Sequence, residues 1–155
     1  MGDLAASSEK DVKLIISFDK SEYKKTEPIN VDIKLNNTGK EAVLVNKRFF
    51  INSEDSPAKN REIYLSVISP SGSKLKYRMP VQEIGLPKTD YFTLLKPQES
   101  ASMENKRDLR NYFDMAGIGE YKISAVYQNI YGQEIGLDVF KGPVSSDTVT
   151  IKVNE

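Results

Sequence analysis

The sequence predicts an all-β fold, an antiparallel sandwich of two packed sheets with about seven to nine strands. Apolar and polar residues alternate in short runs, and turn-forming residues separate those runs. No stretch keeps the 3.6-residue period of a helix over helical length, and residues 104–113, the nearest case, allow a single helical turn. Each alternating strand has one apolar face. Two sheets packed face to face remove such faces from water, which one sheet alone cannot do.

The alternation is clearest around Ile33, where every second residue from Ile29 to Leu35 is apolar. We therefore expect Ile33 at the centre of the core, with Ile123 and Ile151 among its neighbours. The expected strands cover residues 12–18, 29–36, 42–46, 62–69, 91–95, 121–128 and 148–153.

Turn chemistry marks the breaks between these runs. Residues 36–39 (Asn-Asn-Thr-Gly) tolerate positive φ, which predicts a tight hairpin. Residues 69–72 (Ser-Pro-Ser-Gly) predict a chain reversal, and residues 96–99 (Lys-Pro-Gln-Glu) predict a type I turn, because Gln98 stands where type II favours glycine. Residues 78–90 contain two prolines and predict an ordered crossover between sheets.

The composition excludes several kinds of chemistry. The chain has 155 residues, 22 basic and 22 acidic, with neither Cys nor His. Without these residues it has no disulfide, no thiolate and no nucleophile of the Ser-His-Asp kind. The balanced charge argues against nucleic-acid binding, and no apolar run reaches the roughly 20 residues of a membrane helix.

These totals favour a single β-sandwich domain over residues 11–155, after a flexible lead over residues 1–10. We expect no catalytic residue, no cofactor, no metal, no nucleic-acid partner and no membrane insertion. The adjacent carboxylates Glu54 and Asp55 leave weak Ca²⁺ binding open, and a solvated loop is the stronger interpretation.

The segment after the 121–128 strand carries more large apolar residues than a loop usually exposes. Two interpretations stay open for residues 129–142. In the first, these side chains cap the open end of the sandwich. In the second, they form an exposed patch for a protein partner. The candidate patch residues are Ile130, Tyr131, Leu137 and Phe140.

Four stretches, residues 31–39, 95–100, 117–125 and 142–151, resemble turn and core patterns of immunoglobulin-like domains in exported bacterial proteins, including those similar to an intracellular proteinase inhibitor family. In antibody domains, the tyrosine at the position of Tyr121 forms a corner and a Cys follows two residues later. Here Ile123 stands at that Cys position and the chain has no Trp, so the antibody hallmarks are absent, which argues against an antibody-type domain. The resemblance implies an immunoglobulin-like sandwich and carries no functional residue across.

Together these observations predict a monomeric, non-catalytic binding or spacer module for protein–protein interaction. The resemblance favours an exported location (cell surface, periplasmic or secreted), with the cytoplasm left open. The alternative is a protease inhibitor that inserts a loop such as 129–142 or 47–60 into a protease cleft. A small carboxylate-dependent hydrolase is the remote alternative.

Overall fold

The computed structural model describes residues 11–155, and the lead expected over residues 1–10 lies outside them. The described chain is all-β, as predicted, with single 3₁₀ turns as its helical elements. Its strands are β1 (Val12–Phe18), β2 (Glu22–Lys24), β3 (Asn30–Asn37), β4 (Val43–Asn46), β5 (Ile63–Ile68), β6 (Phe92–Leu95), β7 (Ser100–Ser102), β8 (Arg107–Asp108), β9 (Gly119–Tyr127), β10 (Val144–Ser145) and β11 (Val149–Asn154). The 3₁₀ turns are η1 (Ala58–Asn60), η2 (Thr89–Tyr91), η3 (Leu109–Asn111) and η4 (Gln133–Ile135).

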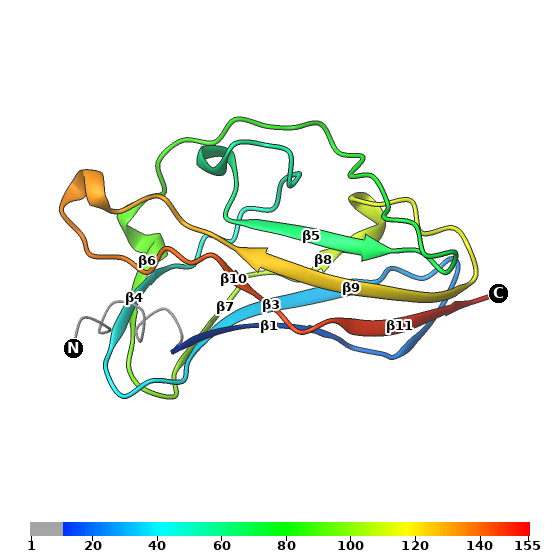
Figure 1. The fold of residues 1–155 in the computed structure, drawn as a ribbon, viewed down its shortest axis with the longest axis horizontal. Coiled ribbons are helices and arrows are strands. Elements are labelled where there is room, and N and C mark those ends of the chain that lie inside the picture. The colour runs from blue at the N-terminus through cyan, green and yellow to red at the C-terminus, as the bar shows by residue number, and fades with distance from the viewer. Residues whose placement is uncertain (1–10) are drawn as a thin grey trace.

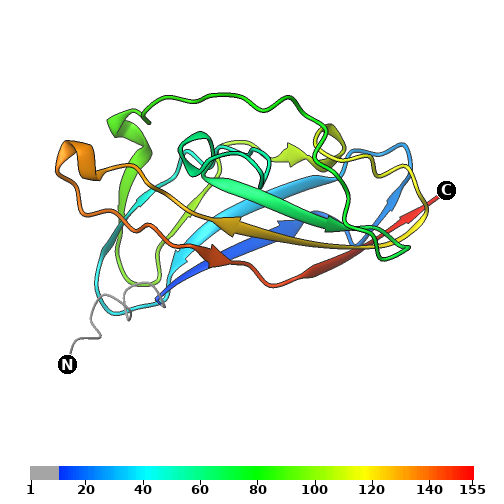
Figure 2. The same ribbon diagram turned by 45° about the horizontal axis from the view of Figure 1, so that its top comes forward.

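The strands form two packed sheets and one smaller pair (Figure 1). The first sheet has the order β1-β3-β7, with β8 also paired to β3. The second has the order β2-β11-β9-β5, and β10 lies on the same side of β9 as β11. β4 and β6 pair with each other at one end of the sandwich (Figure 2). All these pairings are antiparallel except that of β2 with β11, which is parallel because the chain crosses to the second sheet after β1.

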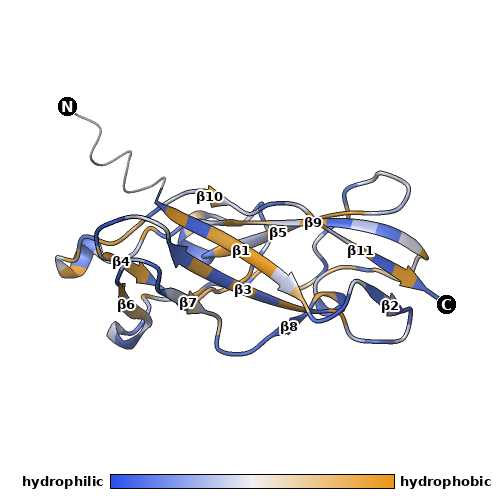
Figure 3. Ribbon diagram, turned by 90° about the horizontal axis from the view of Figure 1, so that it is seen from below, coloured by the Kyte–Doolittle hydropathy of each residue, from blue (hydrophilic) through white to orange (hydrophobic). Residues whose placement is uncertain are grey.

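The core lies between the two sheets and follows the predicted alternation. Along β3, apolar and polar residues alternate from Asn30 to Asn36, and β1 alternates in the same way apart from the apolar Ile15 between Leu14 and Ile16 (Figure 3). Ile33, Ile123 and Ile151 are buried in one hydrophobic cluster, as predicted. At the opposite face of each strand, the polar residues meet solvent, which explains how a chain with 39% hydrophobic residues fills a core.

All seven predicted strands are present, with ends shifted by two residues at most. The structure adds β2, β7, β8 and β10, which makes eleven strands in the described part of the chain instead of seven to nine. These four have two or three residues each, too few to show a period in the sequence. The single turn allowed within residues 104–113 is η3. No helix of residues 11–155 is long and apolar enough to cross a membrane.

Two turn predictions were wrong. Residues 36–39 do not close a tight hairpin, because β3 and β4 belong to different sheets. The Asn37 side chain turns the chain instead: it accepts from the Gly39 N–H at 2.9 Å and donates to the carbonyls of Glu41 and Leu95. Such side-chain bonds to nearby backbone are a common way for Asn to set a turn.

The turn at residues 96–99 has type II geometry, since Gln98 has a φ of 72°. The Glu99 N–H donates to the Lys96 carbonyl at 2.9 Å, which closes the turn. Bonds to the end of β3 hold Gln98 in this conformation: its N–H donates to the Asn37 carbonyl, and the Asn37 N–H donates to the Glu99 carbonyl. Tertiary pairing thus overrides the residue preference on which the type I prediction was based.

Residues 75–91, here called the strap, connect β5 to β6 without a strand of their own. At their start the Leu75 N–H donates to the Val67 carbonyl of β5, and further along the Arg78 N–H donates to the Tyr112 carbonyl beyond β8. The Tyr77 ring stacks on the Tyr112 ring at a centroid distance of 5.8 Å. The strap therefore covers the side of the sandwich between β5 and β8, in agreement with the crossover predicted for residues 78–90.

Candidate functional site

The candidate site is one end of the sandwich, here called the loop end, formed by β4, β6 and residues 129–142. The 129–142 loop projects from this end, and the C-terminus lies at the other (Figure 1). Three features distinguish the loop end: a buried polar cluster, a set of exposed apolar side chains and a cationic cleft.

The buried polar cluster is centred on Glu62, which directly precedes β5 and is fully buried. Arg48 forms an ion pair with it: the Arg48 Nη2 lies 2.5 Å from the Glu62 Oε2, and the Arg48 Nε lies 3.1 Å from the Oε1. The Phe50 N–H also donates to the Oε1 at 2.8 Å. Each carboxylate oxygen therefore accepts charge-assisted or backbone hydrogen bonds, which a buried carboxylate requires.

Two buried asparagines extend this cluster to the loop. The Asn46 Nδ2 donates to the Glu62 Oε2 at 3.2 Å and to the Asn129 Oδ1 at 3.1 Å. Asn129 in turn donates to the Tyr131 carbonyl at 2.8 Å and accepts from the Tyr131 N–H at 3.1 Å. At the far end of the loop, the Phe140 N–H donates to the Leu44 carbonyl of β4 at 2.8 Å. Both ends of the loop are thus fixed to the frame.

Aromatic rings pack beneath the polar cluster. Phe49 meets Tyr127 edge to face at 5.9 Å, and Phe140 stacks on Tyr127 at 6.0 Å. The Tyr127 hydroxyl donates to the Asn46 carbonyl at 2.8 Å. Phe49 has a φ of 52°, a conformation that non-glycine residues rarely adopt. The bonds of Arg48 and Phe50 to Glu62 on either side of Phe49 hold it there.

The structure separates the four predicted patch residues into two groups. Tyr131 and Phe140 are 7% exposed each, so these two rings do not form an exposed patch, and this part of the prediction is corrected. The Tyr131 hydroxyl donates to the Lys59 carbonyl, and the Arg48 guanidinium lies 5.5 Å from the Tyr131 ring centroid. Both rings cap the end of the sandwich. Ile130 is exposed, and Leu137 is half-buried.

Large apolar side chains are nevertheless exposed at the loop end. Ile130 and Ile135 on the loop are 41% and 47% exposed, and Leu94 on β6 is 57% exposed. Leu86 on the strap is 62% exposed and follows Gly85, whose carbonyl accepts a bond from the Arg48 Nη1 at 2.9 Å. Of these four, Ile130 alone was a predicted patch residue. Ile135 lies within the predicted 129–142 segment, whereas Leu86 and Leu94 carry no sequence signal of exposure.

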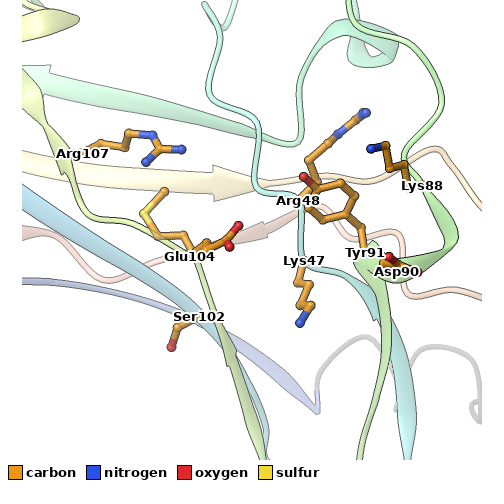
Figure 4. Close-up of a pocket in the computed structure, with 9 residues that line it drawn as sticks. Lys47, Arg48, Lys88, Asp90, Tyr91, Ser102, Glu104 and Arg107 are labelled. Atoms are coloured by element: carbon orange, nitrogen blue, oxygen red, sulfur yellow. The ribbon is translucent and has the colours of Figure 1, made fainter.

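A cleft of about 480 Å³ lies between the end of β4, η2 and the connection of β7 to β8 (Figure 4). On one wall lie Glu104, from the connection of β7 to β8, and Arg107, the first residue of β8. The other wall is formed by the residues at the end of β4 and around η2. Its residues are Lys47, Arg48, Lys88, Asp90 and Tyr91.

The cleft has more positive than negative side chains. Four cations and two carboxylates line it, and Arg48 is already paired with Glu62. Among residues 11–155, no salt bridge involves Lys47, Lys88 or Arg107. These three cations are therefore available to a partner's carboxylates, as charge-assisted hydrogen bonds.

Burial raises the pKa values of several tyrosines, which predicts loss of stability at alkaline pH. Burial is the main cause for Tyr23 and Tyr77, each with a pKa of about 12, and it also raises the pKa of Tyr127 far above its usual range. An unfolded tyrosine ionises near pH 10. A raised folded pKa therefore contributes stability that is complete below about pH 10 and is lost as pH rises through about 12.

We expect the urea midpoint to fall steeply between about pH 10 and 12. Tyr77→Phe removes one of these ionising groups. No hydrogen bond of the Tyr77 hydroxyl contributes to its pKa within residues 11–155, so the midpoint of this variant should fall less steeply. Urea denaturation of both proteins across this pH range provides the test. Identical slopes would show that ionisation of Tyr77 is not linked to unfolding.

The carboxylates Glu54 and Asp55 lie on the surface. Glu54 forms an ion pair with Lys74, and both side chains are partly exposed. Within residues 11–155, no group of three or more His, Cys, Asp or Glu side chains is arranged to hold a metal ion.

The fold and the site define a β-sandwich with a loop fixed at both ends, exposed apolar side chains on that loop, and a cationic cleft. Comparison with protein-family models and with curated proteins finds no match to the chain.

Proposed function

We propose that the chain is a non-catalytic protein-binding module that recognises its partner through the loop end. The observation that carries this proposal is the exposure of Ile130, Ile135, Leu94 and Leu86 at one end of the molecule. Exposed apolar side chains that gather beside polar groups are typical of protein interfaces. The buried cluster around Glu62 supports the proposal, because it holds the loop in one conformation before binding.

The cleft indicates the kind of surface that the partner presents. An apolar partner surface next to Ile130 and Ile135, with carboxylates facing Lys47, Lys88 and Arg107, would complement this end in shape and charge. Rim charges of this kind mainly raise the association rate, so binding should weaken as salt increases.

We also propose that the sandwich is of the immunoglobulin-like kind and that the module is exported. The strand order supports the first part: the chain starts in one sheet as β1 and continues in the other as β2, parallel to β11. The Tyr121 hydroxyl donates to the Gly117 carbonyl at 2.6 Å, the bond that defines a tyrosine corner. Export is inferred from the resemblance of the sequence stretches alone and is tested by locating the chain in cell fractions.

Charge substitutions at the loop end test the proposal. In a double variant with Ile130→Asp and Ile135→Asp, binding of a partner from an extract of the encoding organism should fall at least tenfold, as hot-spot loss predicts. The matched control is Ile118→Asp, because Ile118 is 47% exposed and immediately precedes β9, away from the loop. Equal binding by the double variant and the wild type, with both folded, would contradict the proposal.

A protease inhibitor remains the second candidate, because the tip of the loop around η4 is exposed while its base is fixed by Asn129 and Phe140. A fixed base and an exposed tip are what an inserted inhibitory loop requires. Residual activity of a protease panel, measured with stoichiometric amounts of the chain, separates the two. Inhibition that disappears in the Ile130→Asp and Ile135→Asp variant would favour the inhibitor, and full protease activity would favour the binding module.

A further inference from the structure

A groove of about 410 Å³ lies beside β5, between residues 53–55 and the start of the strap. It is separate from the loop end and is not used by the proposed function. Its apolar lining consists of Leu65, Leu75, Tyr77, Met79, Val81 and Phe113. Met79 and Val81 are among the exposed large apolar residues of the described chain, so one wall of the groove is accessible from solvent.

The outer edge of β5 borders this groove, and the backbone groups of one residue on that edge, Leu65, are unpaired. At Ile63 the edge is paired, since the Ile63 N–H donates to the Phe50 carbonyl at 2.9 Å and the Ile63 carbonyl accepts from the Asn52 N–H at 3.1 Å. At Val67 it is paired again, because its carbonyl accepts from the Leu75 N–H at 2.8 Å. Leu65 lies between them, where the two covering segments diverge.

The alternation of a strand fixes the direction of the Leu65 backbone groups. The Glu62 carbonyl accepts from the Gln128 N–H, so the groups of Glu62 and of every second residue after it face β9. The N–H and C=O of Ile63, Leu65 and Val67 face the other way. No hydrogen bond joins either group of Leu65 to another residue within 11–155.

The burial of Leu65 makes its unbonded backbone N–H and C=O significant. Leu65 as a whole residue is 5% exposed, and the backbone N–H and C=O groups of buried residues are nearly always bonded to another group or to water. Because Leu65 lines the groove, whatever occupies the groove can supply the missing donor and acceptor.

We propose that this groove binds an extended peptide segment of a partner protein, centred on one large apolar residue. An extended peptide residue offers an N–H and a C=O on the same side, which complements the two groups of Leu65. Its side chain then packs among Tyr77, Met79 and Phe113, whose rings and thioether give an apolar wall. The proposal concerns a surface other than the loop end, so it stands or falls independently of the proposed function.

An ion pair between Glu54 and Lys74 joins the two sides of the groove. Both side chains are partly exposed, so the pair contributes little to stability and separates easily. A peptide that enters between residues 53–55 and the strap displaces it. Glu54→Gln should therefore bind such a peptide up to about fivefold more tightly, the upper range for an exposed pair.

The test uses the full chain labelled with ¹⁵N and the probe acetyl-Thr-Thr-Phe-Thr-Thr-amide. On titration, the amide signals of Leu65 and of residues 74–77 should shift. The matched probe carries an N-methyl group on its Phe and cannot donate to the Leu65 carbonyl. Since one hydrogen bond contributes about 1 kcal/mol, the methylated probe should bind about fivefold more weakly.

Two protein variants complete the design. Val81→Asp places a charge on the exposed wall and should abolish binding, whereas Ile118→Asp should leave it unchanged. The Ile130→Asp and Ile135→Asp variant should also bind the probe like the wild type, which keeps this test separate from that of the loop end. Equal affinity for both probes, shifts that map to other residues, or no shift up to the solubility limit of the probe would overturn the proposal.

Discussion

Deletion of residues 147–155 is expected to abolish the native fold. These residues contain β11, which lies between β9 and β2 in the second sheet and pairs with both. Its Ile151 and Val153 side chains are buried, and full burial of each contributes about 1.5–3 kcal/mol. Their loss, together with an exposed edge on β9 and an unpaired β2, exceeds what a domain with a total stability of about 5–15 kcal/mol tolerates.

Near-ultraviolet circular dichroism and urea denaturation of the shortened chain provide the measurement. The expected result is no tertiary signal and no cooperative transition. Ile151→Val is the matched control: it keeps the strand, removes one methylene from the core, and should cost about 0.5–1.5 kcal/mol. A shortened chain with a native spectrum and a sharp transition would show that β11 is dispensable.

Glu62→Ala is expected to destabilise the chain by about 3–5 kcal/mol, the cost of leaving one partner of a buried ion pair alone. The substitution leaves the Arg48 guanidinium, the Phe50 N–H and the Asn46 amide without the oxygens that accept from them. Buried donors without acceptors carry the full cost of desolvation. Urea denaturation at neutral pH measures the effect.

Two variants calibrate this expectation. Glu62→Gln keeps the shape and one acceptor oxygen, so it should cost about 1–3 kcal/mol. Glu54→Ala removes the carboxylate of an exposed ion pair and should cost less than about 1 kcal/mol. If Glu62→Ala were no more harmful than Glu54→Ala, the buried cluster would not be what holds the loop end together.

The strands of the core could be predicted because each has a period of its own. The alternation around Ile33 is local, and it fixed the buried face of β3 correctly. β8 and β10 have two residues each and depend on pairing with β3 and β9, so nothing in their own sequence indicates a strand. Gln98 shows the same limit, since pairing with the end of β3 decides its φ.

The candidate site was predictable in its location and not in its parts. The apolar composition of residues 129–142 correctly marked an unusual loop. That Tyr131 and Phe140 are buried depends on Asn46 and Glu62, which lie more than 60 residues earlier in the chain. One sequence does not show that these residues meet. The cleft likewise combines Lys47, Lys88 and Arg107 from three separate segments.

The buried polar cluster is expected to hold the 129–142 loop in one conformation. Amide hydrogen exchange at Phe140 and Tyr131 measures this, because their N–H groups bond to the Leu44 carbonyl and to the Asn129 side chain. We expect both amides to exchange slowly, like those of β9. Exchange at the rate of an unstructured peptide would contradict the claim.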